Sequence, residues 1–146
     1  MGNRKQIDSQ ISDVIPLRFK INYGEGNLLA IEQDEDVPFD IKRVFLVYDV
    51  PQLETRGKHA HKQQEQVLIS IKGRCDITVK DGEETKNYVL DAPDKGLFIP
   101  AGIWDEVTYC SNDSMLLAFA DDVYDPNDYI DDWDSFLQFK GGTYED

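Results

Sequence analysis

The chain has 146 residues, of which 29 are acidic and 15 are basic, giving a formal net charge of −14. This charge argues against nucleic acid or an anionic membrane as a partner, because their phosphate groups would be repelled. The length fits one domain over residues 1–146, and since no long apolar run or apolar signal core is present, we expect a cytoplasmic protein.

The N-terminal part of the chain alternates between candidate strands and turns. Residues 1–22 form an extension with one plausible strand, residues 14–21, in which Pro16 indicates an edge or an early strand position. Residues 23–27 are a glycine-containing turn. Residues 42–50 are rich in β-branched and aromatic residues, which predicts a strand of the core.

From residue 66 onwards the pattern is regular. Short runs of β-forming residues recur, and Asp81-Gly82 is a strong signal for a two-residue hairpin turn. Strands are expected at residues 66–72, 74–80, 85–90, 97–99, 107–110 and 115–120. Short strands at spacings of roughly 8–12 residues predict an all-β sandwich or barrel. Cys75 and Cys110 lack Cys-x-x-Cys spacing, and we expect both to be reduced.

The C-terminal segment, residues 126–139, has a different period. Its large apolar residues fall on one face of a short helix, at Tyr129, Ile130, Trp133, Phe136 and Leu137. A stripe of this kind belongs to a protein core far more often than to a ligand site. We therefore expect this helix to pack on the sheets.

Both histidines of the chain lie in one short stretch, as His59-x-His61. Side chains alternate along a strand, so the two imidazoles face the same side. Imidazole can give and take a proton near neutral pH and is also the commonest metal ligand. The pair suits proton transfer or metal binding, and two solvated surface histidines are the plain alternative.

The spacing around these histidines resembles the two sequence motifs of the cupins. His59-x-His61 is followed at the motif intervals by Gln66 and a glycine, and a later Pro-x-Gly-x2 pattern ends at Asp105. The resemblance implies a cupin double-stranded β-helix, or jelly roll. Metal-binding cupins have Glu and a third His where this chain has Gln66 and Asp105, and amides are poor ligands for the metals that imidazole favours. A site without metal or other cofactor is expected, with a two-His, one-carboxylate metal site (His59, His61 and Asp105) as the alternative.

Longer stretches are similar to the nucleotide-sugar 3,4-ketoisomerases: FDIKRVFLVYDV, RGKHAHKQQEQVLISIKGRCDITVKDG, DAPDKGLFIPAGIWDEV and VYDPNDYIDDWDSF. The resemblance covers about residues 24–139. It implies a metal-independent tautomerisation of a dTDP-linked 4-keto-6-deoxy sugar through an enediolate, serving the synthesis of 3-amino-3,6-dideoxyhexoses. It also implies that His61 is the base at carbon and that His59 moves a proton between oxygens. A homodimer that exchanges N-terminal strands, with residues 14–21 as the candidate, follows by analogy.

Further residues are candidates for substrate contacts. Arg43 and Arg56 can bind a diphosphate, because guanidinium pairs with phosphate oxygens in a fork. Tyr48 is a candidate supporting acid, with a core tyrosine as the plain alternative. Arg43 and Tyr48 differ by an odd number of positions, so a regular strand places them on opposite faces, and we favour Arg43 for the ligand side.

The chain departs from the family at three positions, where it has acidic residues. Glu25 stands where the relatives have Arg or Tyr, Asp105 where they have His or Arg, and Asp131 where Arg is common. The first two positions are associated in the family with the face of C4 that receives the proton. Glu25 and Asp105 are therefore expected to alter the product or the substrate sugar, and the plain alternatives are that they bind sugar hydroxyls or simply face solvent. A sugar-nucleotide-binding cupin without catalysis is a further alternative.

Overall fold

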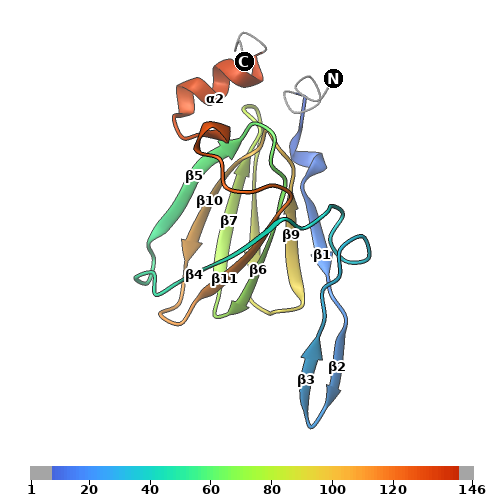
Figure 1. The fold of residues 1–146 in the computed structure, drawn as a ribbon. Helices are drawn as coiled ribbons and strands as arrows, with labels where there is room; N and C mark the ends of the chain where they lie inside the picture. Colours follow the sequence, from blue (N-terminus) through green and yellow to red (C-terminus); the bar gives the residue numbers. More distant parts are fainter. Residues whose placement is uncertain (1–7, 142–146) are drawn as a thin grey trace.

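The computed structural model describes residues 8–141, which form two five-stranded antiparallel sheets packed face to face (Figure 1). The first sheet has the order β1-β9-β6-β11-β4, made of β1 (Ile15–Arg18), β9 (Lys95–Ile99), β6 (Gln66–Lys72), β11 (Met115–Ala120) and β4 (Arg43–Tyr48). The second has the order β12-β5-β10-β7-β8, made of β12 (Tyr129–Ile130), β5 (Thr55–His61), β10 (Trp104–Tyr109), β7 (Cys75–Lys80) and β8 (Thr85–Leu90). No hydrogen-bonded ladder within residues 8–141 joins the two sheets into a closed barrel. The predicted all-β jelly roll of the cupin type is confirmed.

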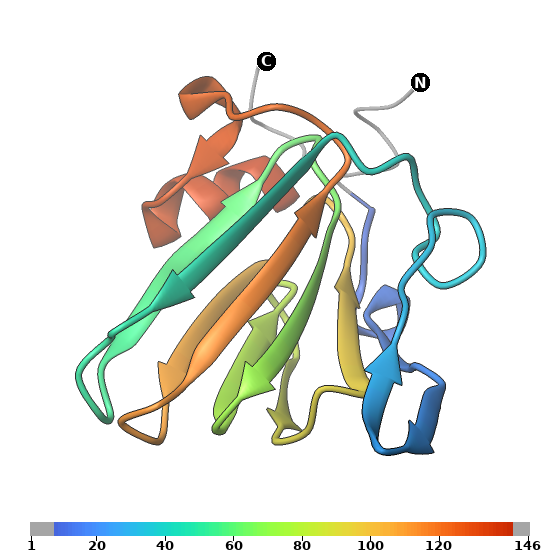
Figure 2. The same cartoon turned by 60° about the horizontal axis from the view of Figure 1, so that its bottom comes forward.

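The core lies between the two sheets, which form separate layers in Figure 2. Strand β7 shows how the sequence builds it: Cys75, Ile77 and Val79 are fully buried, whereas the residues between them are only partly covered. This alternation follows from the two-residue period of a strand. The burial of such apolar side chains, worth about 1.5–3 kcal/mol each, is the main force that holds the layers together.

The N-terminal segment differs from the prediction of one strand at residues 14–21. After the short 3₁₀ turn Ile11–Asp13, β1 is followed by a separate strand, β2 (Ile21–Gly24). The strand is interrupted between them, because Phe19 turns into the core and its N–H donates to the carbonyl of Asp94 instead of continuing the ladder. Strand β1 does lie at the sheet edge, as Pro16 indicated, and pairs with β9 of its own chain. Strands β2 and β3 (Gly26–Leu29) form a hairpin that projects beyond the sheets (Figure 1).

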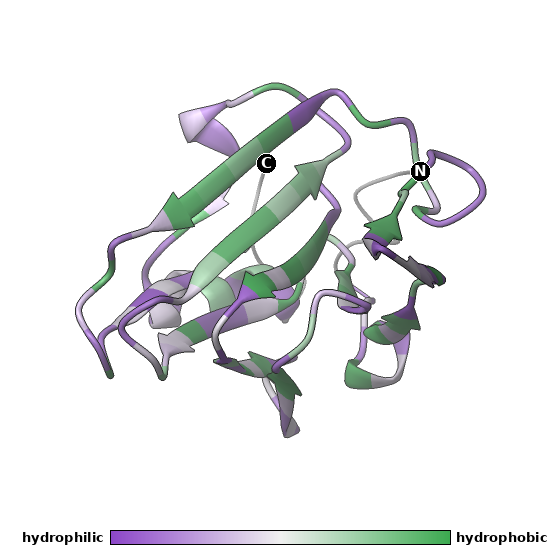
Figure 3. Cartoon of the chain, turned by 90° about the horizontal axis from the view of Figure 1, so that it is seen from below, coloured by the Kyte–Doolittle hydropathy of each residue, from purple (hydrophilic) through white to green (hydrophobic). Residues whose placement is uncertain are grey.

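The outer face of the first sheet is only partly covered. Residues 19–41 pack over β6 and β9 through a second hydrophobic cluster that includes Phe19, Val37 and Phe39. At the edge of the same sheet, β4 is largely hydrophobic (Figure 3), and its outward residues Val44, Leu46 and Tyr48 remain exposed. The chain therefore has an apolar strip on β4 that its own residues 8–141 do not cover.

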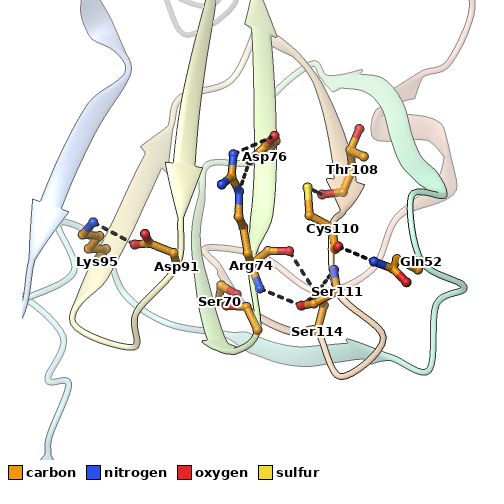
Figure 4. Close-up of polar contacts among 11 residues, drawn as sticks. Gln52, Ser70, Arg74, Asp76, Asp91, Lys95, Thr108, Cys110, Ser111 and Ser114 are labelled. Carbon is orange, nitrogen blue, oxygen red and sulfur yellow. Dashed lines mark hydrogen bonds and ion pairs between the residues drawn. The ribbon is translucent and has the colours of Figure 1, made fainter.

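A polar network holds the turns at the end of the sheets where β6, β7, β10 and β11 are joined (Figure 4). The Ser111 hydroxyl accepts the N–H of Arg74, and the Ser114 hydroxyl donates to the carbonyl of Arg74. The Arg74 guanidinium in turn contacts Asp76 at 3.0 Å. These contacts satisfy backbone groups that the turns leave without ladder partners.

The predicted helix at residues 126–139 is wrong at its N-terminal half. Pro126–Asp128 is a single 3₁₀ turn, β12 follows, and the helix α2 (Trp133–Lys140) begins only after Asp132, whose side chain accepts the N–H of Ser135. Trp133, Phe136 and Phe139 pack against Ala60 and Trp104, as expected for a core helix. Strand β12 pairs with β5 beside the histidines. No helix within residues 8–141 is long and apolar enough to cross a membrane.

Candidate active site

A cavity of about 570 Å³ lies between the two sheets, on the side where β4 and β5 form their neighbouring edges. Five residues expected from the sequence line it together: Arg43, Arg56, His59, Gln66 and Asp105. The C-terminal segment after β11 adds Tyr124, Pro126, Tyr129 and Asp131. The functional residues thus come from both sheets and from a segment that sequence reasoning assigned to the core.

The two histidines meet at one wall of this cavity. The ring centroids of His59 and His61 are 5.1 Å apart and the rings are nearly perpendicular, at 80°. The ring of Tyr129 lies against both, 5.0 Å from His59 and 4.4 Å from His61. His59 lines the cavity, whereas His61 lies behind it with only 5% of its surface exposed. The prediction that the two imidazoles share one side of β5 is confirmed.

His61 has a polar neighbour at each ring nitrogen. Its Nδ1 is 3.1 Å from Oδ2 of Asp128, and its Nε2 is 3.3 Å from the side-chain nitrogen of Gln66. Asp128 is also buried, and its carboxylate accepts the backbone N–H groups of Gln63 (2.8 Å) and Gln64 (3.2 Å). Sequence reasoning missed Asp128, because the apolar stripe of the predicted helix gave this position no function.

A bulge in β5 brings Arg56 and His59 into the same cavity. These residues are three positions apart, so a regular strand would turn them to opposite faces. The register across β10 pairs His59 with Asp105 and Gly57 with Glu106, which leaves Lys58 without a paired residue. Gly57 and Lys58 both have positive φ, 91° and 52°. A bulge with glycine in this conformation reverses the phase of the strand, and here it turns Arg56 toward the ligand space.

Glycine is needed at position 57 for a second reason. A Cβ atom there would lie 3.2 Å from both the backbone oxygen and Oδ1 of Asp105. This contact is tighter than side chains normally make, so any larger residue would push against Asp105. The close approach places the Asp105 carboxyl group directly beneath the bulge.

Asp105 and His59 shift each other's ionisation within the cavity wall. The pKa of Asp105 is raised, chiefly because burial removes water from the carboxyl group, and the nearby His59 and His61 oppose this shift. The pKa of His59 is lowered below 6.5, again chiefly by burial, although Asp105 acts in the opposite direction. Burial therefore favours the uncharged form of both side chains.

Arg43 reaches into the cavity from β4 with an unused donor. Its Nη1 atom is buried and has no hydrogen-bond partner among residues 8–141. The guanidinium carbon lies 4.5 Å from the ring centre of Phe45 and 5.2 Å from that of Tyr124. A buried donor without a partner is costly, and the cost is removed when an anion binds. Arg43 therefore has the features of an anion-binding residue.

Three predicted site residues do not line this cavity: His61, which lies directly behind it, Tyr48 and Glu25. Tyr48 is 56% exposed on the outer face of β4 and lies outside the cavity wall, so its role as a supporting acid stays a prediction. The parity argument that separated Tyr48 from Arg43 is confirmed, since Arg43 lines the cavity. Glu25 lies between β2 and β3 at the tip of the projecting hairpin, away from the residues that line the cavity.

Of the three acidic departures, Asp105 and Asp131 line the cavity and Glu25 does not. Within residues 8–141 no group of three or more His, Cys, Asp or Glu side chains has an arrangement that could hold a metal ion. The alternative of a two-His, one-carboxylate site therefore finds no matching cluster in the described part of the chain. Gln66, at the place of the cupin glutamate, instead directs its amide nitrogen at His61.

A jelly roll with two histidines, a glutamine and a buried carboxyl group between its sheets defines a site of the cupin class. The model of the FdtA family, described as WxcM-like, C-terminal, matches residues 11–141. The chain belongs to this family.

Relatives in this family are isomerases. The chain is 39% identical over 120 residues to the TDP-4-oxo-6-deoxy-alpha-D-glucose-3,4-oxoisomerase of Aneurinibacillus thermoaerophilus, covering 82% of this chain and 86% of the relative. It is similar to the crystal structure of a 3,4-ketoisomerase from Helicobacter canadensis, with a TM-score of 0.86, 40% identity and coverage of 88% and 98%. It is also similar to QdtA, a sugar 3,4-ketoisomerase from Thermoanaerobacterium thermosaccharolyticum in complex with TDP, with a TM-score of 0.87, 34% identity and coverage of 93% and 100%. A histidine-to-asparagine variant of QdtA has been crystallised with TDP-4-keto-6-deoxyglucose.

Proposed function

We propose that this chain is a sugar 3,4-ketoisomerase that converts TDP-4-keto-6-deoxyglucose into a TDP-3-keto-6-deoxyhexose. The observation that carries the proposal is the pair of imidazoles at one wall of a cavity that also holds an arginine with an unused donor. The family relationship supports the same reaction, since its named relatives are 3,4-ketoisomerases.

The reaction needs a base at carbon and a proton carrier between two oxygens. The hydrogen on C3 of the sugar is acidic because it lies next to the C4 ketone. Its removal as a proton gives an enediolate, after which a proton is added to C4 while the C3 hydroxyl gives up its proton and the C4 oxygen gains one. No external electron acceptor is required, because the oxidation at C3 and the reduction at C4 balance within the sugar.

We assign the two steps to the two histidines. His61 is the base at carbon, and His59, which lines the cavity beside Asp105, moves the proton between the neighbouring oxygens. Imidazole suits both tasks, because a group that titrates near neutral pH can act as acid and as base in the same cycle. The uncharged state that burial favours at His59 leaves one ring nitrogen free to accept the proton.

Arg43 and Arg56 are proposed to bind the diphosphate of TDP. Both arginines line the cavity, and arginine binds phosphate oxygens through paired N–H donors. The net charge of −14 makes such a local cationic pair necessary for an anionic substrate. Gln66 and Asp105 are left to contact the sugar.

A homodimer is proposed from the surface of the chain. The β2–β3 hairpin projects with Tyr23 (76%) and Leu28 (60%) exposed, and the apolar strip on β4 is also uncovered. Isolated apolar side chains on a hairpin that packs on little else favour a second copy as their cover. Because the hairpin tip is distant from its own cavity, we propose that Glu25 contacts substrate in the partner subunit. A nucleotide sugar as substrate fits a cytoplasmic protein.

The proposal is tested by proton NMR of TDP-4-keto-6-deoxyglucose with the purified protein in D2O containing EDTA. We expect loss of the C3 proton signal and appearance of a 3-keto sugar, whose coupling constants at C4 give its configuration. His61→Asn should abolish exchange at C3, and His59→Asn should slow isomerisation more than it weakens TDP binding.

Three other results would contradict the proposal. Exchange that requires an added divalent metal would establish a metal-dependent cupin enzyme. Binding of TDP without exchange would establish a sugar-nucleotide-binding protein. Full activity in the double His59→Asn, His61→Asn variant would remove both histidines from the mechanism.

A further inference from the structure

His61 lies between two neighbours with different hydrogen-bonding abilities. Asp128 faces its Nδ1 at 3.1 Å, and the side-chain nitrogen of Gln66 faces its Nε2 at 3.3 Å. An ionised carboxylate can only accept a hydrogen bond, and an amide nitrogen can only donate one. Both contacts are satisfied at once only when His61 has its proton on Nδ1 and an unprotonated Nε2.

Asp128 is held firmly in this orientation. The backbone N–H of Gln63 donates to Oδ1 and that of Gln64 donates to Oδ2, the oxygen that also faces His61. The carbonyl of Asp128 accepts the N–H of Lys62, so its main chain is tied to β5 as well. The carboxylate is only 7% exposed, and it is therefore shielded from water that could compete for the ring.

Gln66 reaches His61 from the opposite sheet, from the first residue of β6. A glutamate here, as in metal-binding cupins, would place an acceptor at each ring nitrogen. Two acceptors favour the doubly protonated imidazolium, which has no free electron pair for taking a proton from carbon. The amide at position 66 avoids this, because its nitrogen leaves Nε2 as the acceptor.

We propose that Asp128 and Gln66 are positioning residues that hold His61 as the Nδ1-protonated tautomer with an unprotonated Nε2, which takes the proton from carbon once the Gln66 amide releases it. The inference deepens the proposed function, on which its catalytic meaning rests. The two residues act through His61. Asp128 fixes the tautomer and the ring orientation, and the Gln66 amide occupies the Nε2 electron pair until it is replaced by substrate.

The tautomer is measured directly by nitrogen-15 NMR of the imidazole rings in the unliganded protein at neutral pH. The chain has only two histidines, so a His59→Gln variant assigns the signals. We expect Nδ1 of His61 to have the chemical shift of a protonated ring nitrogen and Nε2 that of an unprotonated one. A proton on Nε2 would overturn the inference, and this readout depends on neither substrate turnover nor a variant at Asp128.

The second test is the variant Asp128→Asn. One amide oxygen would remain for the backbone donors, and the amide nitrogen would face Nδ1, which reverses the tautomer of His61. We expect kcat to fall on the order of 10²-fold or more, as when a buried orienting carboxylate is replaced elsewhere, while TDP affinity stays within about twofold. Asp125→Asn is the matched control, since its side chain accepts the N–H of Asn127 in the same segment and lies outside the contacts of His61. Gln66→Glu should also lower kcat, with the His61 signals moving to those of the imidazolium.

The outcomes separate this inference from the function on which it rests. A kcat within about threefold of wild type in Asp128→Asn, with an unchanged tautomer, would overturn the positioning role. Failure of the wild-type protein to exchange the C3 proton would instead contradict the proposed function, and the nitrogen shifts would still decide the tautomer. If Asp128→Asn does not fold, the measurement on the wild-type rings remains decisive.

Discussion

His59 and Asp105 occupy paired positions on β5 and β10, immediately beside the bulge at Gly57 and Lys58. Burial lowers the pKa of the imidazole and raises the pKa of the carboxyl group, so the pair resists charge separation. This relationship leads to two predictions, one on stability and one on activity.

Asp105→Asn should become more stabilising as the pH rises. Because burial raises the folded-state pKa of Asp105 above the ordinary value for an aspartate, the folded protein retains a proton that the unfolded chain loses, and stability falls as the pH rises from the ordinary value through the raised one. The asparagine variant does not lose stability in this way, because its side chain does not ionise. Urea unfolding of both proteins at pH 5 and pH 8 measures the difference. A difference in unfolding free energy that does not grow with pH would show that Asp105 ionises without penalty.

The midpoint of the acidic limb, where kcat/KM falls as the pH is lowered, should lie below pH 6.5. The lowered pKa of His59 means that this ring stays uncharged at pH values where a free imidazole is already protonated. The measurement is kcat/KM from about pH 5 to pH 8, which reports ionisations of the free enzyme. A limb above pH 6.5 would contradict the assignment of His59 as a proton carrier in an uncharged state.

Gly57→Ala should destabilise the protein and reduce activity. The substitution combines a positive φ with a Cβ only 3.2 Å from Asp105, and strained positions of this kind cost about 1–3 kcal/mol. Gly26→Ala is the matched control, because Gly26 also has positive φ (97°) but has no atom within 4 Å of its Cβ position. The test is chemical denaturation with TDP titration, and equal losses in the two variants would show that the contact with Asp105 is unimportant.

Arg43→Met should weaken TDP binding by roughly 10- to 100-fold, the loss expected when a charged donor of about 1.5–3 kcal/mol is removed. The unfolding free energy should change little, because the Nη1 donor has no hydrogen-bond partner among residues 8–141 that would be left unpaired. Isothermal titration calorimetry gives the affinity, with Arg18→Met as a control, since Arg18 is an exposed partner of Asp94 outside the cavity. Unchanged affinity in Arg43→Met would mean that the diphosphate binds elsewhere.

Arg56→Ala should chiefly raise KM for the nucleotide sugar.

Leu28→Asp should convert the proposed homodimer into monomers. A carboxylate on the exposed hairpin would have to be buried at the interface, at a cost of several kcal/mol. Light scattering after size-exclusion chromatography measures the mass, and Val123→Asp introduces the same charge at an exposed apolar position outside the hairpin. Identical masses for wild type and Leu28→Asp would mean that this hairpin does not form the contact.

The all-β fold and five of the site residues follow from sequence patterns, namely Arg43, His59, His61, Gln66 and Asp105. Alternation along strands placed His59 and His61 on one side and separated Arg43 from Tyr48, and motif spacing selected Gln66 and Asp105. The two arguments from alternation depend only on the two-residue period, which holds wherever the strand is regular.

The rest of the site depends on features that such rules do not describe. The bulge at Gly57 is invisible to a pattern based on strict alternation, although a glycine within a strand is a known sign of one. Asp128 and Tyr129 were concealed by an apolar periodicity that fits a helix. Asp125-Pro126 is a genuine helix-start signal, but it begins only a single 3₁₀ turn, and the true helix starts after Asp132.

The pairing of β12 with β5 also sets an order of events during synthesis. Residues 59 and 61 leave the ribosome more than sixty positions before Asp128, which lies 67 residues after His61. A nascent chain that has released both sheets up to β11 therefore has its histidines without the carboxylate and without the tyrosine ring that backs them. Since domains fold as their segments emerge, the jelly roll can assemble before its active site does. A chain that ends just before Asp128 would keep every strand from β1 to β11 and lose both the carboxylate and the tyrosine ring that contact His61.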